Sequence, residues 1–111
     1  MAVEDERGIL GCVTFVPDAS SPWAELLEEE EAGVRMLAVL PCAQGRGIGS
    51  RLLDTCIDRA RAGQKRALML HTTPWMQSAH RLYERAGFER LPERDWRPLP
   101  EVPLLAYRLP L

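Results

Sequence analysis

The sequence is poor in aromatic residues and carries no strong charge of either sign. Phe, Trp and Tyr make up only 6% of its 111 residues, and the formal net charge is -2. A balance this close to neutral gives no general attraction to nucleic acid or to anionic membranes, so any positive field must be local. We therefore expect neither nucleic acid nor a membrane among its partners.

Long apolar runs, repeats and paired cysteines are also absent. No apolar segment approaches the ~20 residues that a transmembrane helix needs, and the acidic start of the chain lacks the features of a signal peptide. Cys12, Cys42 and Cys56 are odd in number and form no CxxC pair, so we expect buried, reduced thiols and no metal site. These absences predict a soluble, cytoplasmic protein with a single domain, residues 1–111.

The apolar pattern predicts an α/β fold, a mixed sheet with helical crossovers in the order β-β-β-α-β-α-β-β. The expected strands are Ala2-Val3, 9–16, 34–40, 67–70, 88–91 and 104–109, and a proline-rich connection, 92–103, joins the last two. Strand 34–40 is almost entirely apolar, which is typical of a central strand buried on both faces. The first two strands form a hairpin around a polar turn with Gly8.

Two helices separate these strands. The first follows the glycine-rich turn 44–50 and runs for about three turns, with Gly63 placed to cap its C-terminus. The second is expected from Met76 to Ala86, where Gly87 followed by Phe88 fits a left-handed cap.

The turn between strand 34–40 and the first helix is the strongest candidate binding site. It reads Gln44-Gly45-Arg46-Gly47-Ile48-Gly49-Ser50. Glycines here let the main chain adopt positive φ, and free amides at the start of a helix attract an anion. Three interpretations compete: a ligand-free connection, a nucleotide site, or an anion site of another kind. A dinucleotide-binding fingerprint fails, because Ser50 stands at the third glycine position and the next strand ends at His71 instead of an acidic residue. A P-loop fails, because Ser50-Arg51 follows Gly49 where a Lys and a Ser or Thr are needed.

Residues 37–53 resemble the acyl-coenzyme A-binding motif of the GNAT N-acetyltransferase superfamily, with Gln44, Gly47 and Gly49 at its diagnostic positions. A second block, Ala79-x-x-Leu82-Tyr83-x-x-x-Gly87-Phe88, is similar to another signature of the same family. The resemblance implies that acetyl-CoA lies between splayed strands, 36–40 and 67–71. Its pyrophosphate would sit on the amides of 44–50, and its pantetheine would pair with Leu37 and Val39. A Val39 or Leu40 amide would polarise the thioester carbonyl.

The resemblance also implies a mechanism, in which a primary amine of a small molecule or peptide attacks the thioester directly. Tyr83 would then protonate the leaving thiol, since a phenol has a pKa near that of a thiol. Glu31 is a candidate general base by position, although it belongs to an acidic run, Glu28 to Glu31, typical of solvated surface. His71, at the carboxyl end of a strand, is a candidate polar group on the acceptor side. Met76 stands where the family often has Asn.

The family's usual first strand and helix pair are not recognised, so we expect an N-terminally shortened fold with an open strand edge and an exposed apolar face. A homodimer would cover these, or the chain is a shortened form of a longer protein. Two functions therefore stay open: an N-acetyltransferase, or a non-catalytic acyl-CoA-binding module or inactive truncated enzyme.

Overall fold

The computed structural model describes residues 2–5, 8–20, 27–45, 47–75 and 77–111. Within these residues seven strands form a mixed sheet in the order β1-β2-β3-β4-β7-β5, and β6 pairs with β7. The strands are β1 (Ala2–Asp5), β2 (Gly8–Val16), β3 (Glu31–Val39), β4 (Ala67–Thr72), β5 (Glu89–Arg90), β6 (Trp96–Leu99) and β7 (Val102–Pro110). The helices are α1 (Ile48–Ala62) and α2 (Gln77–Arg85), with short 3-10 turns η1 (Pro41–Ala43) and η2 (Pro92–Arg94). In the described residues, no helix is long and apolar enough to cross a membrane.

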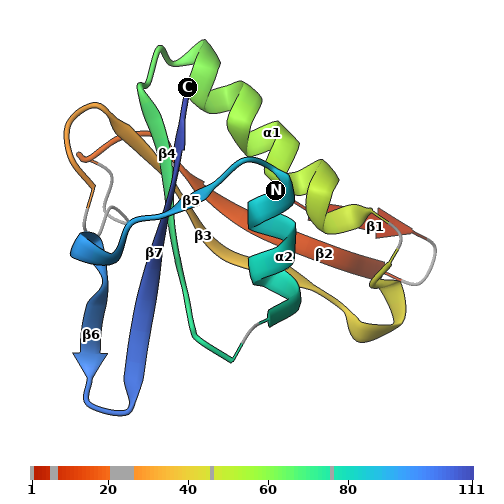
Figure 1. Cartoon of the computed structure of the whole chain (residues 1–111). Helices are drawn as coiled ribbons and strands as arrows, with labels where there is room; N and C mark the ends of the chain where they lie inside the picture. Colours follow the sequence, from red (N-terminus) through yellow and green to blue (C-terminus); the bar gives the residue numbers. More distant parts are fainter. Residues whose placement is uncertain (1, 6–7, 21–26, 46, 76) are drawn as a thin grey trace.

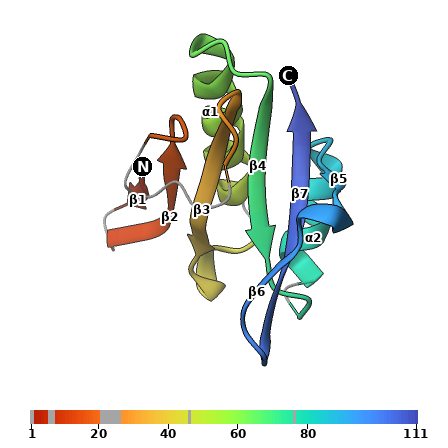
Figure 2. The ribbon, with the colours of Figure 1, turned by 90° about the vertical axis from the view of Figure 1, so that its left-hand side faces the viewer.

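Both helices cover the same face of the sheet (Figures 1 and 2). The predicted amphipathic pattern of α1 is confirmed: its apolar residues recur at helical spacing and join one core with residues of β2, β3, β4 and β7. The helix begins earlier than expected, at Ile48, and has 15 residues. Gly11 of β2 allows it to approach closely, since a Cβ at Gly11 would lie 2.9 Å from Ile48 Cγ2. The parallel pair β3 and β4, joined by α1, makes the predicted helical crossover.

The opposite face of the sheet is better covered than the sequence indicated. Leu68 and Leu70 belong to the helix-side core, so Ala67 and Met69 point to the other face by strand alternation. Both are nevertheless buried, as is Val16, and Leu27 packs against the Gly33 position on that side. The expectation of an exposed apolar face is therefore wrong over this region, whereas β1 does form an edge of the described sheet.

The last strands of the sheet differ from the predicted pair. The proline-rich segment 92–103 is not a plain connection, because it contains η2 and the additional strand β6. Pro98 lies within β6, an edge position at which a missing N–H removes no ladder hydrogen bond from a second neighbour. The sequence did not predict β6 because a proline within a segment argues against a strand.

Strands β5 and β6 together form one interrupted edge along β7. Residues 91–95 lie between the two paired segments, and the Leu91 amide still donates to the Ala106 carbonyl at 2.9 Å. Asp95 Oδ1 accepts from the Ala106 amide at 2.7 Å, and Arg90 Nη1 also donates to the Ala106 carbonyl at 2.7 Å. Arg90 and Asp95 also form a bidentate pair at 2.8 and 2.9 Å. Side chains thus satisfy the Ala106 amide, add a second bond to its carbonyl and close the base of the excursion.

Strand β3 is shifted relative to the prediction of residues 34–40. It begins at Glu31 and ends at Val39, and Leu40 lies outside it with 47% of its surface exposed. Only the first half of the strand is buried on both faces, because β4 stops pairing with β3 after Val34.

Exposure of the cysteines also departs from expectation. All three thiols are free, but only Cys56 is buried, and burial raises its pKa to about 11. Cys12 and Cys42 are exposed, so the prediction of three buried thiols is wrong for these two.

The predicted caps of both helices are confirmed, and in α1 the left-handed residue follows the C-cap. Gly87 has φ +101°, and the Phe88 amide donates to the Tyr83 carbonyl at 3.0 Å, the pattern of a Schellman cap. At the end of α1, Gly63 has an ordinary φ of -81°, while Gln64 takes the left-handed conformation with φ 59°. Lys65 completes this cap by donating to the Ala60 carbonyl. Gly63 is therefore the C-cap, as the sequence predicted, and the left-handed conformation belongs to the next residue.

The left-handed Gln64 and the ordinary Gly63 predict different effects on stability for two neighbouring substitutions. Gln64→Gly should raise the free energy of unfolding by roughly 0.5–1 kcal/mol, because it relieves left-handed strain on a side chain. Gly63→Ala should change it by less than about 0.5 kcal/mol, since an added Cβ makes ordinary contacts there. Urea unfolding measures both, and a loss of more than about 1 kcal/mol in Gly63→Ala would contradict the cap.

Candidate cofactor cleft and active site

The sheet opens between its two central strands. Parallel pairing of β3 with β4 runs from Glu31–Ala67 to Val34–Leu70 and then stops, although β3 continues to Val39. On its other side, β3 stays paired with β2 as far as Val39. The second half of β3 therefore has no strand partner toward β4 among the described residues. The predicted splay is confirmed, but it begins only after Leu70, so residues 67–70 of β4 do not line it.

The glycine turn lies at the end of this open strand segment. Gly45 and Gly47 have φ of +83° and +76°, values that side chains rarely adopt, and Gly47 is the N-cap of α1. The first amides of a helix have no intrahelical acceptor, so this helix start presents donors and positive potential together. Arg46, predicted to contribute to the same site, lies outside the described residues.

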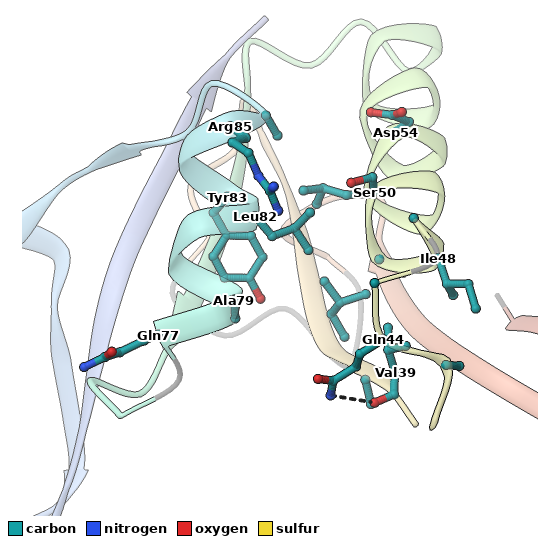
Figure 3. A pocket seen from close by; sticks show the side chains of 18 of the residues that line it. Val39, Gln44, Ile48, Ser50, Asp54, Gln77, Ala79, Leu82, Tyr83 and Arg85 are labelled. Atoms are coloured by element: carbon teal, nitrogen blue, oxygen red, sulfur yellow. Dashed lines mark hydrogen bonds between the residues drawn. The ribbon is translucent and has the colours of Figure 1, made fainter. Parts of the chain in front are cut away.

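A cleft of about 1020 Å³ joins the turn to the open strand and to α2. It lies between α1 and α2, with the end of β3 at its base (Figure 3). Its lining includes these residues predicted from the sequence: Leu37, Val39, Gln44, Gly45, Gly47, Ile48, Gly49, Ser50 and Tyr83. One continuous space thus contains backbone without a strand partner, a helix N-terminus and a phenol.

The backbone at the base of the cleft has a defined polarity. The Leu40 amide donates to the Leu10 carbonyl of β2 at 2.8 Å, so it is not available to a ligand, contrary to one alternative from the sequence. Successive strand amides point to opposite edges, which turns the Val39 amide away from β2 and toward the splay. The Gln44 side chain donates to the Val39 carbonyl at 3.4 Å and ties the turn to the strand.

Tyr83 enters the cleft from the inner face of α2. Its hydroxyl points into the space between the helices (Figure 3), and the residue is only 5% exposed. Its ring packs against Phe88 and Tyr107, with centroids 6.0 and 5.8 Å away. Burial, with a smaller contribution from Tyr107, raises the pKa of Tyr83 to about 12. The expected match to a thiol pKa is therefore absent, and the phenol stays fully protonated near neutral pH.

Glu31 lies far from this cleft, at the first residue of β3. About 26 Å of extended chain separates it from Val39, and its side chain is buried, at 4% exposure, rather than on solvated surface. Arg94 of η2 donates to both of its carboxylate oxygens at 2.8 and 2.7 Å, and the Glu28 amide donates at 3.0 Å. Burial would raise the pKa of Glu31, but Arg94, the Glu28 amide and Arg108 together hold it below its ordinary value. These contacts describe an anchor for η2, and they do not favour a general base.

Several residues of the cleft and its surroundings were not found from the sequence. Arg85 of α2 and Asp54 of α1 line the cleft (Figure 3), as does Trp75, which is 63% exposed. The position of Arg85 on the face of α2 that is turned toward α1 could have indicated that it lines the cleft. No local pattern could have indicated Arg94, which meets Glu31 across 63 residues of sequence. Met76 lies outside the described residues.

His71 follows the last β3–β4 residue pair on β4. Its Nε2 lies 3.1 Å from the Arg94 carbonyl, and the residue is half-buried. The structure thus connects His71 with η2 and, through Arg94, with Glu31.

The family of the chain follows from comparison with known proteins. Residues 1–88 match the model of the acetyltransferase (GNAT) family, so the chain belongs to that family. Its members are transferases that use acetyl-CoA as co-substrate. The fold, with its mixed sheet, splayed strands and two helices, is the GNAT fold.

Individual relatives agree with this placement. The chain is 32% identical over 80 residues to an IAA acetyltransferase of Azospirillum brasilense, covering 72% of this chain and 47% of that protein. It superposes on a GCN5-related N-acetyltransferase from Kribbella flavida with a TM-score of 0.71 and 27% identity, covering 99% and 66% of the two chains. The NatC complex bound to Gag peptide and CoA gives a TM-score of 0.76 at 26% identity, covering 98% and 65%. The chain thus spans about half of the curated relative and about two thirds of these solved chains.

The buried pair at the start of β3 generates a pH-dependent prediction. Glu31→Gln should lower the free energy of unfolding by roughly 1–3 kcal/mol at pH 7, because Arg94 loses a charged bidentate partner. Since folding lowers the pKa of Glu31, this stabilisation is present above the ordinary value of 4.5 and is lost as the pH falls below it. The difference between wild type and variant should therefore shrink in acid, as followed by urea unfolding.

Glu30→Gln is the matched control for this substitution. Glu30 lies 3.6 Å from Arg66 with both side chains largely exposed, so little change is expected at any pH. Equal effects of the two substitutions would contradict the anchoring role of Glu31.

Proposed function

We propose that this chain binds acetyl-CoA in the cleft between α1 and α2 and transfers the acetyl group to a primary amine by direct attack. One observation carries the proposal: the unpartnered half of β3 leads directly to the glycine-rich start of α1, and both share a cleft with Tyr83. This arrangement fits an extended ligand with an anionic centre and a reactive end near a phenol. The NatC complex, similar in fold, was solved with CoA.

The cofactor is oriented by the two ends of this arrangement. Its pyrophosphate lies on the amides of residues 44–50, where the helix dipole and the positive-φ glycines favour a close anion. The pantetheine pairs with backbone groups of Leu37 and Val39, which β4 leaves open. The thioester carbonyl then lies at the Val39 amide, a fixed donor toward the charge that develops on oxygen during attack. Arg46 and Arg51, and also Arg85 at the cleft wall, add positive charge for the phosphates.

Tyr83 acts as general acid in this proposal. The amine nitrogen forms a bond to the thioester carbon, the carbon–sulfur bond breaks, and sulfur takes the phenolic proton. The extra proton on the new amide nitrogen returns to the phenolate, so the products are the amide and the free thiol. Because its pKa is raised to about 12, the phenol is protonated before each turnover and a strong base afterwards.

A non-catalytic acyl-CoA-binding module is the second candidate. The matched region contains the cofactor half of the family fold and spans only 47% of the curated relative. Such a module would bind acetyl-CoA as tightly and release no thiol with any amine, so turnover separates the two functions.

The compartment and the partners of the protein are proposed from its cysteines, its relatives and its open strand edge. Three free thiols fit a reducing compartment, and we place the protein in the cytoplasm. The acceptor in this proposal is the primary amine of either a small molecule or a peptide. The NatC complex was solved with a peptide. The open edge of β1 is where we expect a second copy of the chain to pair.

Cofactor binding is tested at Gly49, on the cleft side of α1. A Cβ there would lie 3.0 Å from Leu82 Cδ2, so Gly49→Val narrows the cleft between the helices. We expect acetyl-CoA to raise the melting temperature of the wild type, and Gly49→Val to weaken its Kd at least about tenfold, a loss of ~1.4 kcal/mol. Calorimetric titration measures the affinity.

Ala62→Val is the control, because it places the same residue at an exposed position of the same helix. Its affinity should match the wild type. Equal Kd values for wild type and folded Gly49→Val would contradict the proposal that acetyl-CoA binds in this cleft.

The general acid is tested by Tyr83→Phe. The variant should bind acetyl-CoA with unchanged Kd but turn over about 10²-fold more slowly, because it cannot protonate the thiol. Tyr107→Phe is the matched control: it is also buried, its ring is 5.8 Å away, and it does not line the cleft. Release of thiol, followed with an amine panel, gives kcat, and wild-type kcat in Tyr83→Phe would exclude the role.

A further inference from the structure

Trp75 lies on the loop that follows β4, where the sheet has opened. The last residue pair between β3 and β4 is Val34–Leu70. Val39 and Trp75 each lie five residues further along their own segments of the chain, and both line the cleft. With 63% of its surface exposed, Trp75 presents a large aromatic side chain to a molecule that enters there.

The loop that carries Trp75 has a fixed base. His80 Nε2 of α2 lies 2.8 Å from the Thr73 carbonyl, and because a carbonyl oxygen only accepts, the imidazole donates. The ring of His80 is in turn 5.8 Å from that of Tyr107 on β7. Pro74 fixes its own φ and restricts Thr73 to extended conformations. Trp75 is therefore exposed on an anchored loop, which reduces the entropy lost when a ligand packs against it.

The two ends of the cleft differ in charge. In the part of the chain that the structure describes, the charged residues of the lining are Asp54 and Arg85, which lie at the end away from Val39 (Figure 3). Trp75 precedes α2 whereas Arg85 ends it, and the nine residues of this helix span about 13 Å. Among the described residues, the end with Trp75 and Gln77 thus has a neutral lining without a carboxylate or a guanidinium.

The acceptor reaches the thioester from the side that the cofactor leaves open. In the proposed function the pyrophosphate covers the glycine turn 44–50, and the thioester lies between Val39 and Tyr83. Trp75 belongs to the other wall, which the loop after β4 and α2 form. An amine that enters along this wall passes the indole before it reaches the reacting carbon.

We propose that Trp75 binds the acceptor and selects primary amines that carry an aromatic or apolar group and no second charge. This role rests on the proposed acetyl transfer. An indole face attracts the ammonium group of an arriving amine and packs against an aryl group. A diamine would leave its second ammonium without a carboxylate at this end of the cleft, and an amino acid would leave its carboxylate without a cation. Both lose affinity, because a charge that leaves water without a partner is costly.

The test compares 2-phenylethylamine with 1,4-diaminobutane as acceptors. Wild type should acetylate 2-phenylethylamine with a kcat/KM at least about tenfold higher, as followed by thiol release. Trp75→Leu should raise the KM for 2-phenylethylamine about fivefold with unchanged kcat, because it removes the aromatic face. The KM for 1,4-diaminobutane and the Kd for acetyl-CoA should stay at their wild-type values.

Trp96→Leu is the matched control. Trp96 of β6 is also an exposed tryptophan, at 38%, but it does not line the cleft. Its kinetic constants for both amines should match those of the wild type, and thermal unfolding shows that both variants are folded.

Binding of the amine is also followed without turnover. 2-Phenylethylamine is titrated into protein saturated with CoA, and the tryptophan fluorescence is recorded. The fluorescence should change in wild type and in Trp96→Leu, and it should stay constant in Trp75→Leu, which lacks the indole that the amine contacts.

The outcomes separate the role of Trp75 from the proposed function. A preference for 1,4-diaminobutane, or a wild-type KM for 2-phenylethylamine in Trp75→Leu, would overturn this role and leave the acetyl transfer standing. A weaker Kd for acetyl-CoA in Trp75→Leu would also overturn it, because the indole would then belong to the cofactor site. Acetyl-CoA binding without transfer to any amine in the wild type would overturn the proposed function, and the fluorescence titration would still decide whether Trp75 binds the amine.

Discussion

The early end of the pairing between β3 and β4 is the constraint on which the rest of the site depends. Two parallel strands normally satisfy each other's backbone groups along their whole shared length. Here only four residue pairs do so, and the remaining half of β3 is held by β2 alone. The open backbone, the start of α1 and the inner face of α2 meet at that opening. The position of the cleft is therefore set by the residue pair at which β3 and β4 stop pairing.

Unsatisfied strand groups are handled in two ways in this sheet. Along β3 they are left facing the cleft, where an extended ligand can pair with them. Along β7 side chains help to satisfy them, since Asp95 accepts from the Ala106 amide and Arg90 joins the Leu91 amide at the Ala106 carbonyl. The first arrangement creates a binding surface, and the second keeps the edge ordered while η2 crosses to the other face and anchors on Glu31.

The fold, the glycine turn and the position of Tyr83 in the cleft could be predicted from the sequence because their signals are local. Glycines at 45, 47 and 49 between an apolar strand and an amphipathic helix specify the turn, and Tyr83 four residues before Gly87 specifies its place on α2. Strand β6 was missed because Pro98 argues locally against a strand, and an edge position removes that objection. Gly63 was correctly predicted as the cap of α1, whereas nothing in the local sequence marked Gln64 as the left-handed residue after it.

The face opposite the helices could not be predicted in the same way. Glu31 reads as one of four acidic surface residues, and only the distant Arg94 makes it a buried anchor. Long-range ion pairs leave no periodicity or spacing in a sequence, so position alone could name Glu31 as a candidate base but could not show that Arg94 binds both of its carboxylate oxygens. The contact between His71 and the Arg94 carbonyl was equally hidden.

The clamp of Arg90 and Asp95 makes the excursion between them a module. The two side chains close its base, while between them the Leu91 amide bonds to Ala106 and Arg94 holds buried Glu31 of β3. The excursion is therefore fastened at its base to β7 and at its far side to β3. A change in its length would be felt first at Glu31, at the start of β3, and not at the glycine turn at the other end of that strand.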